Sequence, residues 1–288
     1  MIEHPIMLVL SKRSPALPYS SNNQSGFHAA HPQFHLYTGL GSQTVASSVL
    51  LPEEVPVAFV YNGISQAVMM ASPFDLEDFA LGYSIGSGLI KDASCIYGIE
   101  ITQGIAGIEL QISVSQRAFA NIKQLRRTQA GSTGCGLCGV ESLANVLPDL
   151  ASHPPQALPP AQHLSKLRSR LASHQLLAKQ TGALHAALYV DEDGDIKLCR
   201  EDVGRHNAMD KLIGALLNDQ CFPERGFVVV TSRCSLELIQ KAVRAGFSTL
   251  ATLSAPTNIS VSWARHCQLN LVHIPRSSDP RVYSPEPL

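Results

Sequence analysis

Two cysteines three positions apart, Cys135 and Cys138, are the residues of this chain best suited to chemistry. They stand in the segment GCGLCG at residues 134–139. Because glycine accepts backbone conformations closed to other residues, the segment is predicted to be a mobile, accessible loop. Basic residues precede it, Lys123 and Arg126 among them, and nearby positive charge favours the thiolate, which is the reactive form of cysteine.

Such a pair can form a disulfide, carry sulfur as a persulfide, or supply half of a zinc site. A tetrahedral structural zinc site needs four ligands. The other five cysteines stand singly, and none makes a second C-x-x-C. The spacing therefore favours redox or sulfur chemistry over a metal site, and no metal ligand is predicted. Spacing alone does not choose between disulfide exchange and sulfur carriage.

Composition narrows the class of protein. The chain has 288 residues, 45% of them hydrophobic, and is long enough for two domains or one large one. A net charge of -1 argues against a broad nucleic-acid surface, although a local basic pocket for a phosphorylated small molecule is compatible with it. No apolar run approaches the ~20 residues of a membrane span, and the first ten residues do not resemble a signal peptide. Seven cysteines without a disulfide framework predict a cytoplasmic, reducing location.

The first half of the chain divides into an arm and a subdomain. Residues 1–45 are rich in Ser, Pro, Asn, Gln and His and are predicted to be poorly ordered. Residues 46–147 are predicted to form a smaller α+β subdomain that ends in the cysteine loop. The proline-rich stretch 148–160 is the best candidate for a connection. Within the subdomain we expect strands at 55–61, 64–70, 99–101 and 108–114, and helices at 73–85 and 115–127.

Residues 161–288 are predicted to form an α/β domain. Leucine periodicity predicts one helix over 162–179. After it, strands and helices alternate, which predicts a parallel sheet with right-handed crossovers. The expected strands are 184–190, 196–200, 227–231, 249–253 and 269–274, and the expected helices are 207–217, 235–245 and 257–267.

Polar residues gather where these strands pass into helices. The junctions are 200–207 (REDVGRHN), 231–235 (TSRCS) and 254–257 (SAPT), and His185 follows a glycine turn at a strand start. Ligands bind at the carboxyl ends of strands in open α/β sheets, and a helix N-terminus suits an anion. The alternative is structural: helix capping by the serines, a buried Cys234 and a hydrogen-bonded His185. A G-x-G-x-x-G fingerprint and a Walker A loop are both absent.

With these junctions in view, the chain resembles the FdhD-type formate dehydrogenase accessory sulfurtransferases. The resemblance covers most of residues 50–275. The string REDVGRHNAMDK at 200–211 is very specific, whereas C-x-x-C alone is not. The other matching motifs are EEVP at 53–56, DLEDFALG at 75–82, the cysteine loop, TGALHAA at 181–187, SRCS at 232–235 and SAPT at 254–257.

The resemblance implies a function and a fold. Proteins of this kind accept persulfide sulfur from a cysteine desulfurase and pass it to the bis-molybdopterin guanine dinucleotide cofactor (or its tungsten counterpart), which then goes to a formate dehydrogenase. They are homodimers, and their C-terminal three-layer domain is cytidine-deaminase-like. Neither H-x-E nor P-C-x-x-C occurs here, so deaminase zinc chemistry is not expected.

Residue roles follow from the same resemblance. Cys135 would hold the persulfide, and Cys138 would assist transfer or resolve it. The cofactor segment would be 274–279, with Arg276 as its cation. The chain departs from the family at Asp279, where relatives usually carry a second arginine; Arg281 is the candidate replacement. The residues predicted to bind the cofactor, with GDP as its mimic, are His185, Arg205, His206, Ser232, Arg233, Ser254, Ile274, Pro275, Arg276, Ser277, Ser278 and Asp279.

Two rival functions stay open on the sequence. One is a cofactor chaperone that binds the guanine-dinucleotide pterin without catalysis, with the cysteines incidental. The other is a dithiol–disulfide oxidoreductase. The usual thioredoxin-type context, a C-x-x-C that opens a helix after a strand, is not evident in this chain.

Overall fold

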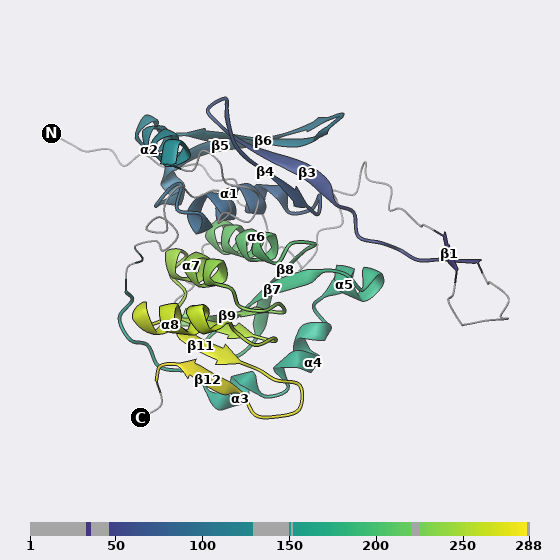
Figure 1. Ribbon diagram of the computed structural model, residues 1–288, viewed down its shortest axis with the longest axis vertical. Coiled ribbons are helices and arrows are strands. Elements are labelled where there is room, and N and C mark those ends of the chain that lie inside the picture. The colour runs from purple at the N-terminus through teal and green to yellow at the C-terminus, as the bar shows by residue number, and fades with distance from the viewer. Residues whose placement is uncertain (1–32, 36–45, 129–149, 151, 220–224, 287–288) are drawn as a thin grey trace, which may run out of the picture.

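The computed structural model describes residues 33–35, 46–128, 150, 152–219 and 225–286. Two larger sheets with helices packed between and around them make up most of this part of the chain (Figure 1). A short antiparallel pair, β1 (Gln33–His35) with β2 (Ala46–Ser48), precedes them. The predicted mixed α/β class is confirmed. None of the helices in the described ranges has the length and apolarity needed to cross a bilayer.

The N-terminal sheet has four strands in the order β4-β3-β6-β5. The hairpin predicted around Asn62-Gly63 is confirmed: both residues have positive φ, 45° and 81°, as a tight two-residue turn requires. The Asn62 amide then bonds both the N–H and the carbonyl of Val114, which ties the turn to a third strand. The strands are β3 (Val55–Tyr61), β4 (Ile64–Ala71), β5 (Ile96–Gly104) and β6 (Gly107–Val114).

Helix α1 (Leu76–Gly86) joins the two halves of the molecule. It packs under the N-terminal sheet and crosses α6 (Arg205–Asn218) of the other half (Figure 1). Glycines permit an unusually close approach: a Cβ at Gly82 would lie 1.7 Å from the Asp210 carbonyl oxygen, and one at Gly214 would lie 1.9 Å from that of Asp78. The other helices described in this half are the short 3-10 turn η2 (Ala93–Cys95) and α2 (Gln116–Thr128).

The C-terminal sheet has six strands in the order β12-β11-β10-β9-β7-β8. The predicted parallel sheet is confirmed for its three central strands, β9 (Phe227–Val230), β10 (Thr249–Thr252) and β11 (Asn270–His273). The outer strands run antiparallel to their neighbours, so the sheet is mixed. They are β7 (His185–Val190), β8 (Ile196–Asp202) and β12 (Arg281–Ser284).

Helices cover both faces of this sheet, as the predicted three layers require (Figure 1). One face carries α6 with α7 (Leu236–Arg244) and α8 (Asn258–His266). The prediction of a single helix over 162–179 is wrong. Three short helices stand there, because Ser165 is extended and Lys166 has a left-handed φ of 51°, which ends one helix before the next begins. They are α3 (Ala161–Leu164), α4 (Leu167–Ala172) and α5 (Leu176–Thr181).

The two halves share one hydrophobic core. A continuous cluster of buried side chains runs from Phe59 in the N-terminal sheet through Phe79 of α1 and Met209 of α6 to Val228 of the C-terminal sheet. A smaller cluster, which includes Leu171 of α4, fills the other face of that sheet. Because the larger core crosses from one sheet to the other, movement of either half would expose apolar surface.

Candidate functional site

The predicted junctions meet at one edge of the C-terminal sheet, which we call the junction edge. The carboxyl ends of β9, β10 and β11 lie there side by side: Leu253 N–H bonds the Val230 carbonyl, and Ile274 N–H bonds the Thr252 carbonyl. Because β7 is antiparallel to β9, its first residue, His185, lies at the same edge. His185 pairs in register with Asp202, so the end of β8 and the start of α6 lie there too.

Several charged or titratable side chains stand together at this edge, among them His185, Arg205 and His206, with the Glu237 carboxylate 3.3 Å from His206 Nδ1. Burial, and then the charge of Arg205, lower the pKa of His185. Burial, followed by the charges of Arg205, Lys241 and His185, lowers the pKa of His206 to about 3. Both imidazoles are therefore neutral near pH 7, and Arg205 supplies the positive charge. Neutral donors beside a cation at a helix N-terminus suit an anionic ligand.

The next two junctions place Ser232, Arg233 and Ser254 along the same edge. Ser232 is buried and its hydroxyl bonds the Arg233 carbonyl, whereas the Arg233 side chain is exposed. The two loops touch, since Thr257 N–H and the Ser260 hydroxyl both bond the Cys234 carbonyl. The junctions after β9 and β10 are thus one connected surface above the starts of α7 and α8.

The segment 274–279 is anchored at its start and exposed beyond it. Arg168 of α4 donates from Nε to the carbonyls of Ile274 at 3.0 Å and Pro275 at 3.2 Å, and its guanidinium also bonds the Leu253 carbonyl. The ends of β10 and β11 are therefore held by one side chain. From Arg276 to Asp279 the side chains are exposed. Arg281 is the candidate replacement for the second arginine of the family. Its Nη2 lies 3.5 Å from the Ser278 hydroxyl, so its positive charge lies beside this segment.

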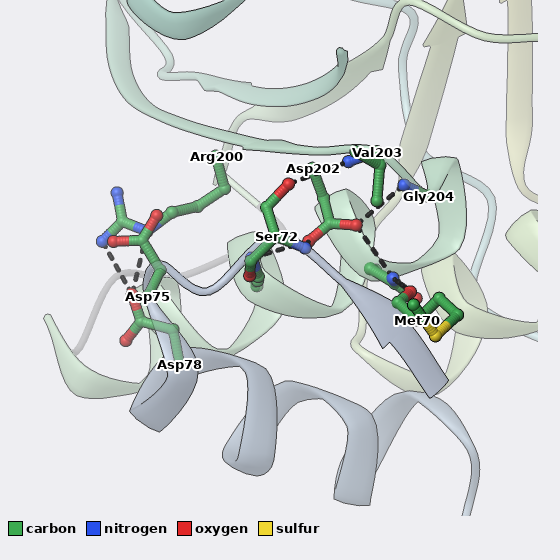
Figure 2. A network of polar contacts seen from close by, with 10 residues as sticks. Met70, Ser72, Asp75, Asp78, Arg200, Asp202, Val203 and Gly204 are labelled. Atoms are coloured by element: carbon green, nitrogen blue, oxygen red, sulfur yellow. Dashed lines mark hydrogen bonds and ion pairs between the residues drawn. The ribbon is translucent and has the colours of Figure 1, made fainter. Parts of the chain in front are cut away.

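Under the edge, a buried carboxylate holds the loop that presents Arg205. Asp202 is fully buried and accepts from the N–H of Gly204 at 2.7 Å and of Ser72 at 3.0 Å (Figure 2). It also accepts from the Asn207 amide at 2.8 Å and forms an ion pair with Lys211 at 2.7 Å. These donors fix the turn from β8 into α6, so that the start of α6 is set by the carboxylate beneath it.

The same network reaches across to the N-terminal half. Lys211 also donates to the Ser72 carbonyl at 2.9 Å, and Asn207 donates to the Met70 carbonyl. Nearby, Arg200 forms ion pairs with Asp78 at 2.8 Å and Asp75 at 3.7 Å, as Figure 2 shows. The linker between β4 and α1 is therefore bonded directly to the loop at the junction edge.

Cys135 and Cys138, which are predicted to carry the sulfur chemistry, lie outside the described residues, and their geometry stays a prediction. Burial raises the pKa of Cys199 strongly and that of Cys234 to about 12, so both thiols are protonated and unreactive at neutral pH. The structural interpretation of Cys234 is confirmed, since its side chain is fully buried.

Two hollows in the described part of the chain lie away from the junction edge. One, of about 360 Å³, is beside the β7–β8 turn and is lined by Arg170, His174 and Lys197. The other, of about 310 Å³, lies at the ends of α6 and α7 and includes Leu216 and Phe247. Both are at the opposite edge of the sheet, so neither coincides with the predicted cofactor residues. Over the same described ranges, no group of three or more His, Cys, Asp or Glu side chains is arranged for a metal ion.

The sequence did not reveal Ser72, Lys211 or Arg168 as part of this site. Ser72 bonds Asp202 across 130 residues and Arg168 bonds Ile274 across 106, and neither has a local motif. Lys211 is the last residue of the specific string at 200–211. A lysine at such a position in a helix is usually predicted to be exposed. One signal was present: adjacent acidic and basic residues, Asp210 and Lys211, within a mostly apolar helix indicate buried ion pairs.

Comparisons with known proteins agree with the family resemblance that the motifs indicated. The FdhD/NarQ family matches residues 52–287. The chain is 45% identical to a curated "Sulfur carrier protein FdhD" of Bordetella petrii, over 81% of this chain and 84% of that protein. It is 44% identical to the protein of that name in Variovorax paradoxus, over 80% and 83%. A crystal structure from Desulfotalea psychrophila, described as a formate dehydrogenase accessory protein, superposes with a TM-score of 0.65 at 24% identity, over 90% of this chain and 98% of that one.

Proposed function

The chain belongs to the FdhD/NarQ family, and from that premise we propose that it carries sulfur on Cys135 from a cysteine desulfurase to a bis-molybdopterin guanine dinucleotide cofactor. A sulfur-carrier role tied to formate dehydrogenase is what the family and the name of the curated relatives support. The donor, the persulfide and the cofactor acceptor are our extension. The proposal includes a homodimer in the cytoplasm that serves a formate dehydrogenase.

The observation that carries the proposal is the junction edge. A guanine dinucleotide presents phosphates, which are bound by arginines and by helix N-termini. Arg205, Arg233 and Arg276 lie at the ends of strands along this edge, beside the starts of α6, α7 and α8. Neutral His185 adds a hydrogen-bonding group that does not repel an anion, and His206 holds the Ser235 hydroxyl beside the same edge.

The dithiol supplies the transfer chemistry in this proposal. A thiolate that attacks sulfur must be accessible and partly deprotonated. Burial raises the pKa of Cys199, Cys234 and Cys267, which disfavours the thiolate of each. The proposal places the chemistry on the glycine-flanked pair, with Cys135 as the carrier and Cys138 as the group that assists transfer or resolves the persulfide.

Mass spectrometry after incubation with a cysteine desulfurase and cysteine tests the proposal. Cys135 should gain one sulfur atom, and Cys135→Ala should abolish both this gain and the activation of a formate dehydrogenase. Cys95→Ala is the matched control, because Cys95 is a free thiol outside the proposed machinery. A wild-type protein that gains no sulfur would remove the proposal.

The same variants separate the rival functions. For a cofactor chaperone, Cys135→Ala keeps formate dehydrogenase active whereas Arg205→Gln and Arg276→Gln do not. For a dithiol–disulfide oxidoreductase, the number of free thiols follows the redox buffer with no desulfurase present. Sulfur gain that depends on both desulfurase and Cys135 distinguishes sulfur carriage from both.

A further inference from the structure

Three polar side chains lie in contact at the junction edge: Ser235, His206 and Glu237. Ser235 is the N-cap of α7, yet its side chain makes no capping bond to that helix. Its hydroxyl oxygen lies 3.1 Å from Nε2 of His206, and Nδ1 of the same ring lies 3.3 Å from a carboxylate oxygen of Glu237. A hydroxyl, an imidazole and a carboxylate in this order are the arrangement that activates a serine.

The charge state of the imidazole suits that role. Burial lowers the pKa of His206, so the ring is neutral and can accept a proton. A neutral ring has one N–H, and Glu237 favours that N–H on Nδ1. The lone pair of Nε2 then faces Ser235, whose hydroxyl becomes the donor.

The surroundings add the other groups that acyl transfer needs. The first backbone N–H groups of a helix have no intrahelical acceptor, and Ser235 directly precedes those of α7. Such N–H groups stabilise the negative oxygen of a tetrahedral intermediate. Arg205 lies close enough to influence the pKa of both His206 and Glu237, so a cation is available for an anionic substrate group.

We propose that Ser235, His206 and Glu237 are an acyl-transfer site for small carboxylic esters or thioesters that carry an anionic group. Ser235 Oγ bonds to the carbonyl carbon while its proton passes to His206 Nε2. The bond from that carbon to the leaving oxygen or sulfur then breaks, and the leaving group takes the proton. Water hydrolyses the acyl-serine by the same route, so the cycle is balanced without an oxidant or reductant. The inference does not depend on sulfur carriage.

The pKa of His206 sets the turnover rate that we expect. A general base works best when its pKa lies near the working pH, and that of His206 lies well below it. Turnover is therefore slow, and covalent capture of the serine is a sharper measure than product formation. An anion bound at Arg205 offsets one of the charges that lower this pKa, so anionic substrates react faster than neutral ones.

The experiment is labelling of the full chain with a fluorophosphonate, followed by peptide mapping. The Ser235 oxygen bonds to phosphorus as fluoride leaves. One adduct per chain is expected, on Ser235. His206→Gln should slow labelling at least about 100-fold and Glu237→Gln about tenfold, in proportion to the usual contribution of a general base and its orienting group. The 3-carboxy derivative of 4-nitrophenyl acetate should be hydrolysed faster than the parent ester.

Ser262→Ala is the matched control, since Ser262 is exposed on α8 and bonds only its own helix. It should label at the wild-type rate. An adduct absent from Ser235, or a His206→Gln variant that melts normally and labels at the wild-type rate, overturns the proposal. Should His206→Gln not fold, the position of the wild-type adduct and the rate for Glu237→Gln decide. None of these readouts uses the cofactor, so failure of the proposed sulfur carriage leaves the outcome interpretable.

Discussion

Helix α6 carries two buried ion pairs from adjacent residues, and they differ in what else they hold. Asp210 receives both of its hydrogen bonds from one group, Lys241 Nζ, at 2.8 Å each. Asp202, the acid paired with Lys211, also accepts from two backbone N–H groups and an amide. The first pair links two helices of one half. The second links the two halves of the molecule and the loop at the junction edge.

The weakness of the first pair shows in the pKa of its acid, Asp210. Burial raises the pKa of Asp210 to about 6 even though Lys241 opposes the shift, because one cation offsets the loss of water only in part. Asp202 instead has several donors in place of the lost water: two backbone N–H groups, an amide and Lys211. A buried ion pair by itself therefore adds little to the stability of the fold. A carboxylate that also accepts from several backbone N–H groups holds those segments in place.

The largest loss of stability is expected when the Asp202–Lys211 pair is replaced. Replacing Asp202 by Leu together with Lys211 by Met removes both charges but leaves the N–H groups of Ser72 and Gly204 without acceptors. Each unsatisfied buried donor costs ~1–3 kcal/mol, so for these two donors we expect a loss of about 2–6 kcal/mol in the free energy of unfolding. Chemical denaturation measures it. A double variant as stable as the wild type would show that these donors find other partners.

A smaller effect concerns the pH dependence at the start of α6. The pKa of His206 lies near 3 when folded and near 6.5 when unfolded, so the unfolded chain takes up the proton first. The neutral His206 ring makes its full contribution to the free energy of unfolding above about pH 6.5. That contribution is lost as the pH falls towards 3. The wild type should therefore lose more stability than His206→Gln between about pH 7 and pH 4.5. Equal losses in urea titrations at the two pH values would contradict the neutral imidazole.

The smallest effect is expected for the other pair. Replacing Asp210 by Leu together with Lys241 by Met leaves no backbone donor without its acceptor among the bonds described for this pair. Such replacements of a buried pair are often neutral or stabilising. We expect a change within about 1 kcal/mol by the same denaturation assay. A loss as large as that of the Asp202 double variant would erase the distinction between the two pairs.

Local patterns predicted most of the fold. The alternation of β-branched runs with helical segments in 184–274 gave the strands and helices to within a few residues, and Asn62-Gly63 gave the hairpin. The helix over 162–179 was wrong because leucine spacing does not reveal the left-handed backbone at Lys166. The edge strand β12 was missed, since Arg281–Ser284 is short and mostly exposed, with little apolar alternation.

The site was predictable in part for the same reason. Strand-to-helix junctions are local, and sheet topology brings them to one edge, so Arg205, Ser232 and Ser254 were within reach of the sequence. Contacts between distant segments were not: Ser72 meets Asp202 only because α1 packs on α6. Ser235 was noted as a cap, yet its hydroxyl bonds a histidine 29 residues earlier in the chain.

A crystal structure of the protein with GDP would show whether the junction edge binds the cofactor. The diphosphate is expected at this edge, within hydrogen-bonding distance of Arg205 or Arg276 and of the hydroxyl of Ser232 or Ser254. GDP bound instead in the hollow beside Leu216 and Phe247, or no GDP bound by a correctly folded protein, would contradict this expectation.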